Sequence, residues 1–192
     1  MKALPWLAAI VLFFEMPVPI YWLVLHTRIQ FWRQHVLAGY WIAIVLAWGG
    51  GDGLLYHFRR QLFDWRAAAA PSWLAVPGLL LIALDFFAFA SSEMHLGTRR
   101  LVGQAELTGT GELAVSGLYT RIRHPRYFGM IAGVLGSSLL IGLRPLWIIS
   151  IFWCGLALSV IVLEERELRL RFGSAYSDYA RRVPALLPFR FR

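Results

Sequence analysis

The chain has 192 residues, of which 58% are hydrophobic and only 16% are charged. A soluble domain carries about a quarter charged residues, so this composition excludes an ordinary water-soluble fold and indicates a surface that largely faces lipid. The formal net charge of +8 would suit a nucleic-acid partner by its size alone, but the distribution of the basic residues argues against one.

Five apolar stretches follow one another along the chain, at residues 3–25, 36–56, 73–92, 127–142 and 145–163. Four are long enough for a helix that crosses a hydrocarbon core of about 30 Å. The fourth is short by roughly 6 Å at the rise of an α-helix. Only Leu143 and Arg144 separate it from the fifth, which predicts a tight helical hairpin. We therefore expect an all-α integral membrane protein with about five transmembrane helices.

Acidic residues interrupt the first three stretches, at Glu15, Asp52 and Asp85. A carboxylate inside a membrane is costly and usually faces a partner or a wet cavity. These acids either pair with His or Arg of neighbouring helices, lie protonated near an interface, or supply polarity to a binding site. The first stretch lacks a cleavage-type small-residue site and contains two prolines, so we expect a retained span and not a signal peptide.

The basic residues lie unevenly about the five expected spans. Fourteen of the 19 Lys and Arg residues fall on the side of the third loop and the C-terminal tail, which the positive-inside rule places in the cytoplasm. This pattern favours anionic lipid headgroups over nucleic acid. We expect a multi-pass protein of the cytoplasmic membrane in a bacterium, or of the endoplasmic reticulum in a eukaryote. The lone Cys154 predicts no internal disulfide, and no Cys/His spacing predicts a metal site.

The most informative polar stretch is residues 117–129, which reads GLYTRIRHPRYFG. The proline after His124 favours an extended or turn geometry there, and Tyr127 then opens the fourth span. The unpaired N–H groups of that helix N-terminus favour an anionic ligand. Tyr119 and Tyr127 offer flat faces to a purine or a sulfonium cation. A basic membrane-surface loop with interfacial tyrosines explains the same residues, and their types alone leave both interpretations open.

A second polar cluster ends the fifth span at residues 164–173. Two of its acids have favourable i,i+4 partners and an ordinary surface explanation, namely Glu165 with Arg169 and Glu167 with Arg171. Glu164 has no such partner and is the acid nearest the membrane, so a ligand ammonium or ribose hydroxyl would satisfy it. Gly173 is expected to end the helix. The aromatic, basic tail that follows can fold back on the membrane surface.

At these residues the sequence resembles the integral-membrane enzymes that comprise isoprenylcysteine carboxyl methyltransferases and phospholipid N-methyltransferases. The shared pattern is G-x-Y, R-H-P-x-Y-x-G, a helical hairpin, E-E-x-x-L, F-G-x-x-Y-x-x-Y and V-P-x-x-L-P-F. The pieces lie in this order at residues 117–119, 123–129, 164–168, 172–179 and 183–189. Each piece is unspecific alone, whereas the ordered set is specific and covers residues 100–189.

The resemblance implies S-adenosylmethionine as cofactor, with S-adenosylhomocysteine as product, in a pocket closed by the cytoplasmic loop, the hairpin and the tail. It implies methyl transfer to a lipophilic or amphiphilic acceptor, such as a prenylcysteine carboxylate, a phospholipid amine or a thiol. Residues 96–192 would form the cofactor region, and residues 1–95 a three-span scaffold on the acceptor side. The cofactor contacts implied by position are Gln104, Gly111, Glu112, Leu113, Ala114, Tyr119, His124, Pro125, Arg126, Tyr127 and Glu164.

His124 and Glu164 are also the candidate catalytic residues, because either side chain could take a proton from an amine or thiol acceptor. Prenylcysteine-specific members place an arginine one helical turn before the acid, where this chain has Val160, which argues against a prenylcysteine acceptor. Two other functions remain open: an NADPH-dependent sterol reductase and a non-enzymatic assembly or haem-handling protein. No G-x-G-x-x-G follows a strand pattern, so a Rossmann cofactor domain is not expected.

Overall fold

The computed structural model describes residues 4–62, 70–96, 104–109 and 111–187, and within these ranges the chain is helical and contains no strand. The first part forms α1 (Leu4–Glu15), α2 (Val18–Thr27), α3 (Ile29–Gln34), α4 (Val36–Ile44), the π-helix η1 (Val45–Asp52), α5 (Gly53–His57) and α6 (Arg59–Leu62). The second part forms the 3₁₀ turn η2 (Ser72–Leu74), α7 (Ala75–Leu96), α9 (Gln104–Thr108), the 3₁₀ turn η3 (Gly117–Thr120), α10 (Pro125–Ile141), α11 (Arg144–Phe172) and α12 (Ser174–Arg182).

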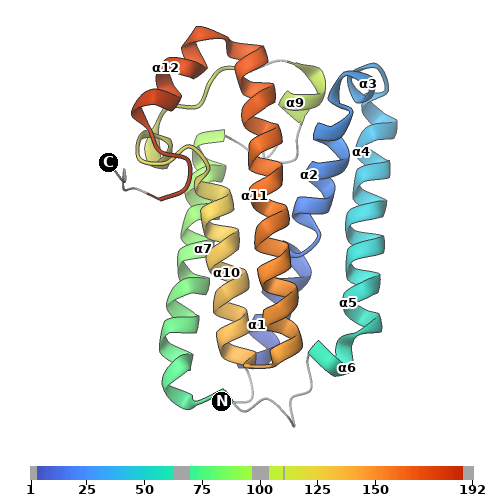
Figure 1. Ribbon diagram of the computed structural model, residues 1–192, viewed down its shortest axis with the longest axis vertical. Coiled ribbons are helices and arrows are strands. Elements are labelled where there is room, and N and C mark those ends of the chain that lie inside the picture. Colours follow the sequence, from blue (N-terminus) through green and yellow to red (C-terminus); the bar gives the residue numbers. More distant parts are fainter. Residues whose placement is uncertain (1–3, 63–69, 97–103, 110, 188–192) are drawn as a thin grey trace.

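Four helical segments are long and apolar enough to cross a membrane: Leu4–Thr27, Val36–His57, Ser72–Leu96 and Arg144–Phe172. The fifth apolar helix, α10, has only 17 residues. It packs against α7, α1 and α11 in the interior of the bundle, and most of its side chains are buried (Figure 1). Because protein surrounds α10, its length need not match the bilayer. The predicted all-helical membrane architecture is confirmed.

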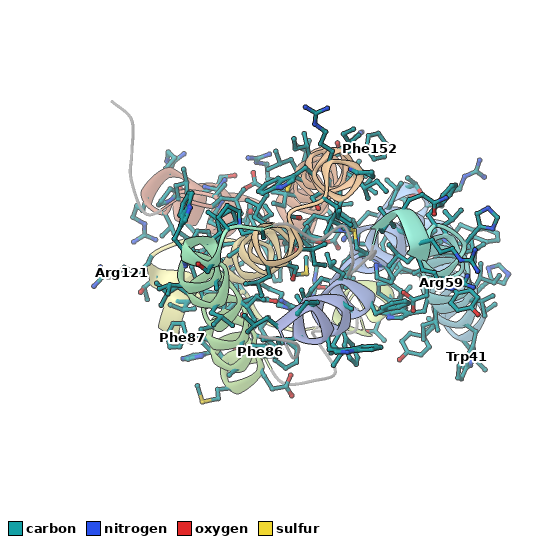
Figure 2. The ribbon with its side chains drawn as sticks, turned by 90° about the horizontal axis from the view of Figure 1, so that it is seen from below. Trp41, Arg59, Phe86, Phe87, Arg121 and Phe152 are labelled. Atoms are coloured by element: carbon teal, nitrogen blue, oxygen red, sulfur yellow. The ribbon has the colours of Figure 1, made fainter. Side chains whose placement is uncertain are left out.

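The outer surface of the bundle carries large apolar side chains. Trp41 on α4, Phe87 on α7 and Phe152 on α11 project outward from three different helices (Figure 2). Each is more than half exposed. Exposed apolar side chains in such numbers mark a surface that is covered by another apolar phase, which for these helices is lipid.

The breaks between helices lie where the sequence predicts them. Proline at position 17 separates α1 from α2 within the first span. Gly142 has a left-handed backbone (φ +74°) and, with Leu143, turns the chain from α10 into α11, so the expected hairpin is confirmed. Gly173 also has a positive φ (+57°) and ends α11, which allows α12 to turn away from it.

A row of glycines lets α7 and α10 approach each other closely. A Cβ atom at Gly129 would lie 2.7 Å from the Ala88 side chain, and one at Gly136 would lie 2.6 Å from the Gly78 carbonyl oxygen. Small residues at this spacing are the usual means by which membrane helices bring their backbones into contact. This α7–α10 contact fixes the position of the first turn of α10, where the polar residues of the site begin.

Candidate active site

The segment before α10 is held in place by the C-terminal tail. The backbone N–H groups of Arg123 and His124 donate hydrogen bonds to carbonyls of the segment that follows α12, at 2.9 and 3.0 Å. The Arg123 guanidinium donates to the Ala180 carbonyl (3.0 Å), and the Tyr179 hydroxyl donates to the Tyr119 carbonyl (2.7 Å). The tail thus folds back against the His-Pro segment, whereas its expected contact with the membrane surface stays a prediction.

The glycine of the G-x-Y pattern has a clear structural reason. Gly117 has a left-handed backbone (φ +59°), and a Cβ atom there would lie only 2.2 Å from the imidazole of His95. His95 is at the end of α7 and its Nδ1 lies 2.7 Å from the Ser91 carbonyl. The glycine thus allows the loop to pass directly over the last turn of α7.

The imidazole of His124 lies between two consecutive carboxylates of α11. Its Nδ1 is 3.8 Å from Oε2 of Glu164, and its Nε2 is 3.3 Å from Oε1 of Glu165. Glu165 also accepts hydrogen bonds from Arg123 and Arg169, both at 2.9 Å, whereas the contact to Glu164 is too long for a hydrogen bond. The expected meeting of the His-Pro segment with Glu164 is confirmed, and Glu165 anchors the imidazole from the other side.

The surface explanation for Glu165 and Glu167 is wrong, because both side chains are buried. Glu165 does pair with Arg169, but its main partners are the loop residues just described. Glu167 pairs with Arg33 of α3. The i,i+4 pattern describes an isolated helix, whereas this end of α11 is covered by α3, α9 and α12.

A cavity of about 760 Å³ joins polar and apolar walls in one space. Its polar wall contains Glu164 and the tyrosines Tyr127 and Tyr176. The buried hydroxyl of Tyr127 interacts with Glu164, and that of Tyr176 interacts with Arg123. The apolar wall comes from α1, α2, α4, η1 and α7 and includes Ile10, Phe14, Val18, Trp22, Ile44, Trp48, Phe86 and Phe89.

The structure brings most of the sequence-predicted cofactor residues to this cavity. Eight line it, namely Glu112, Leu113, Ala114, Tyr119, His124, Arg126, Tyr127 and Glu164. Pro125 is buried as the first residue of α10 and does not line the cavity. Gly111 is exposed and does not line the cavity either. Gln104 begins α9, but its side chain lies outside the described part of the structure. The roles of all these residues remain predictions.

Arg126 has a different environment from the one expected of a cofactor contact. Its guanidinium donates to Oε1 of Glu15 on α1 (2.5 Å) and to Oδ1 of Asp85 on α7 (2.8 Å). Pairing of the two acids with an arginine of a neighbouring helix was one of the predicted alternatives, and it is confirmed for both. Asp52, the third acid, keeps a buried Oδ1 without a hydrogen-bond partner among the described residues.

Glu106 is a cavity residue that the sequence did not single out. It lies on α9, and its Oε2 is buried without a hydrogen-bond partner among the described residues. Burial, and next the nearby Glu164 carboxylate, raise the pKa of Glu106 from its ordinary value to about 7. No sequence signal marks it, because α9 is a single short turn whose position depends on its contact with α3.

Comparison with known proteins supports the pattern found at these residues. The isoprenylcysteine O-methyltransferase of Mus musculus is 29% identical over 142 residues, 69% of this chain and 47% of the relative. Methanethiol S-methyltransferase 2 of Bradyrhizobium diazoefficiens is 30% identical over 67% of this chain and 54% of the relative. A Delta(14)-sterol reductase of Mus musculus is 28% identical over 62% of this chain and 32% of the relative. The chain spans about half the length of the curated relatives it matches.

No solved structure matches the chain at a significant level. The sequence profile of the phospholipid methyltransferase family matches residues 73–175, which include α7, the His-Pro segment, the helical hairpin and the beginning of α12. The matched region exceeds half of the 192 residues and contains the polar wall of the cavity from Tyr119 to Glu164. The chain is therefore a membrane protein of the phospholipid methyltransferase family.

Proposed function

We propose that this protein is an S-adenosylmethionine-dependent methyltransferase that acts on a lipophilic or amphiphilic acceptor in the membrane. Residues 96–192 bind the cofactor, and residues 1–95 supply the acceptor side. One observation carries the proposal: a single cavity is lined at once by the polar residues of the family pattern and by the apolar faces of the membrane helices. A polar cofactor and a lipid-like acceptor can meet in such a space.

The residues of the polar wall fit this cofactor. When bound, it supplies a methyl group on a sulfonium, and transfer of that methyl group leaves a neutral thioether that needs no proton. The Glu164 carboxylate offers negative charge to a ligand ammonium or to ribose hydroxyls. The hydroxyls of Tyr127 and Tyr176 add hydrogen-bonding groups, and the strip from Glu112 to Ala114 forms the loop side.

The protein contributes chiefly by position and by exclusion of water. The Arg123–Glu165 pair and the tail hold His124 against Glu164. The apolar wall keeps water away from the space where donor and acceptor align. If the acceptor is an amine or a thiol, a proton must leave it, and His124 and Glu164 are placed to receive that proton.

Titration of the detergent-purified protein with S-adenosylhomocysteine by calorimetry tests the cofactor site. We expect binding by the wild type and weaker binding by Glu164→Gln and His124→Ala. Glu167→Gln is the matched control, because Glu167 is on the same helix and buried but does not line the cavity. Absence of wild-type binding would refute the proposal, and equal losses in all three variants would show that Glu164 is not the relevant acid.

A parallel titration with NADPH separates this function from that of a reductase, since one relative is a sterol reductase. We expect no NADPH binding. Transfer of radiolabelled methyl from the cofactor to total membrane extract, followed by identification of the labelled product, identifies the acceptor. We also propose that the C-terminal tail and the cofactor entrance face the cytoplasm, which accessibility labelling of Cys substituted for the exposed Ser174 in intact cells would check.

A further inference from the structure

A buried ion cluster lies on the cavity wall formed by the membrane-crossing helices. It consists of Arg126 from α10, Glu15 from α1 and Asp85 from α7, and all three residues line the cavity. Two carboxylates share one guanidinium, so the ionised cluster has a surplus negative charge. Asp85 is near the middle of α7, which places the cluster well inside the apolar length of the bundle.

One oxygen of this cluster is left without a partner. Glu15 is 6% exposed, its Oε1 accepts from Arg126, and its Oε2 is buried with no hydrogen-bond partner among the described residues. In the ionised state this oxygen is a strong acceptor without a donor, and in the protonated state it is a donor without an acceptor. Either state is costly inside a membrane unless something in the cavity contacts the oxygen.

The cavity reaches the lipid-facing surface close to this cluster. Phe14 of α1 and Phe86 of α7 both line the cavity, yet they are 65% and 55% exposed. Phe86 lies between α7 and α1 in the view along the bundle (Figure 2). Because Phe14 adjoins Glu15 and Phe86 adjoins Asp85 in the sequence, a molecule that enters between these two helices would meet aromatic rings first and the carboxylates next.

We propose that Glu15, held by Arg126, determines which head group the lipophilic ligand carries. Its free oxygen accepts a hydrogen bond from a non-anionic donor, an ammonium in preference to a hydroxyl, and the surplus negative charge of the cluster rejects a carboxylate. The ligand's hydrocarbon chain lies between the exposed aromatic residues of α1 and α7. This inference rests on the proposed function in one respect: it takes this ligand to be the methyl acceptor.

Three amphiphiles of equal chain length test the selectivity: octylammonium, octanol and octanoate. Each is titrated into the protein in dodecyl maltoside at pH 7.5, with protein-free micelles as the blank. For the wild type we expect octylammonium to bind at least about tenfold more tightly than octanoate, with octanol between them, because a hydrogen bond to a charged partner is worth that much. Wild-type affinities for octylammonium and octanoate within twofold of each other would overturn the proposal without any variant.

Two isosteric variants then separate the oxygen of Glu15 from the net charge. Glu15→Gln removes the free carboxylate oxygen, and we expect the preference for octylammonium over octanoate to fall to about threefold or less. Asp85→Asn removes the same unit of charge but leaves that oxygen in place, so most of the preference should remain. Equal losses in the two variants would show that charge alone selects the ligand and would refute the role of Glu15.

The cofactor titration keeps the two proposals distinct. If the wild type binds S-adenosylhomocysteine and shows no preference among the amphiphiles, the selectivity of Glu15 fails and the proposed function stands. If the ranking is found but S-adenosylhomocysteine does not bind, the methyltransferase proposal fails while the head-group preference of the cavity is established.

Discussion

Glu165 contacts two arginines, and the structure predicts very different consequences for their loss. Arg123 reaches it from the loop before α10 and has a side chain that is only 11% exposed. Arg169 reaches it from one turn further along α11, and its side chain is 52% exposed. Replacement of each arginine by methionine removes one ion pair to the same carboxylate and keeps an unbranched side chain of similar length. The comparison therefore isolates the effect of burial.

The Arg123 side chain makes more than the ion pair. It also donates to the main-chain carbonyls of Ala180 and Val183, so Arg123→Met removes the buried ion-pair partner of Glu165 and the donor to two carbonyls. Removal of one partner of a buried ion pair costs roughly 3–5 kcal/mol. Arg169→Met loses an i,i+4 pair whose arginine is half exposed to solvent, which contributes about 0.3–0.5 kcal/mol. We expect the two variants to differ in stability by about 3 kcal/mol or more.

Thermal unfolding in detergent measures the difference. A chain of this length shifts its midpoint by roughly 2–4 °C for each kcal/mol, so Arg123→Met should lower the midpoint by about 10 °C and Arg169→Met by less than about 2 °C. Addition of Glu165→Gln to Arg123→Met should then cost far less than Glu165→Gln alone, because the two residues act on each other. Equal shifts for the two arginine variants would refute the view that the tail is fixed through a buried Arg123.

Three further predictions concern the loop and the tail. Glu106→Gln should stabilise the protein at pH 8 by at most about 3 kcal/mol and have little effect near pH 4. The reason is that an acid whose pKa is raised to about 7 in the folded state destabilises that state as it ionises with rising pH. Unfolding midpoints from pH 4 to pH 8 check the sign, and a difference that does not change with pH would refute it. Gly117→Ala should lower the unfolding midpoint and weaken S-adenosylhomocysteine binding, since the new methyl group meets His95 at a left-handed backbone position. Addition of His95→Ala should remove this contact and restore part of the loss. A double variant that is no better than Gly117→Ala would contradict this cause. Tyr179→Phe should lower the free energy of unfolding by roughly 1–2 kcal/mol through loss of its hydrogen bond to the Tyr119 carbonyl. Tyr40→Phe, a tyrosine change far from the tail, serves as the control in the same thermal unfolding experiments. An equal loss of stability in the two variants would argue against that hydrogen bond.

The helices of this protein and several of their ends can be predicted from the sequence, because the patterns that mark them are local. Apolar length identifies the helices, and the glycines at 142 and 173 identify two helix ends through their left-handed backbone. The placement of His124 beside Glu164 could also be predicted, since the ordered family pattern links the His-Pro segment to the end of the hairpin. These features depend on neighbours in the chain or on a recurrent motif.

The remaining features of the site depend on partners that are distant in sequence. Nothing near Arg126 indicates that it pairs with Glu15, which is 111 residues earlier, and nothing near Glu167 indicates Arg33, which is 134 residues earlier. Arg171 lies four residues after Glu167 in the sequence, and this local pairing led to the wrong expectation of an exposed Glu167 side chain. Long-range ion pairs follow from how helices pack, and a single sequence does not contain that information.

The glycine contact between α7 and α10 has a consequence for how molecules can pass through the wall of the bundle. The Gly78 carbonyl oxygen lies against Gly136, and the Asp85 side chain fills the space beside Gly133, so the two helices are in close contact along much of their shared length. Parting or sliding these helices would sacrifice that whole row of contacts, and they therefore behave as one rigid pair. Helix α1 has only 12 residues and is separated from α2 by a proline break. If the ligand enters between α1 and α7 as proposed above, we expect the opening to widen by displacement of α1 against a stationary pair.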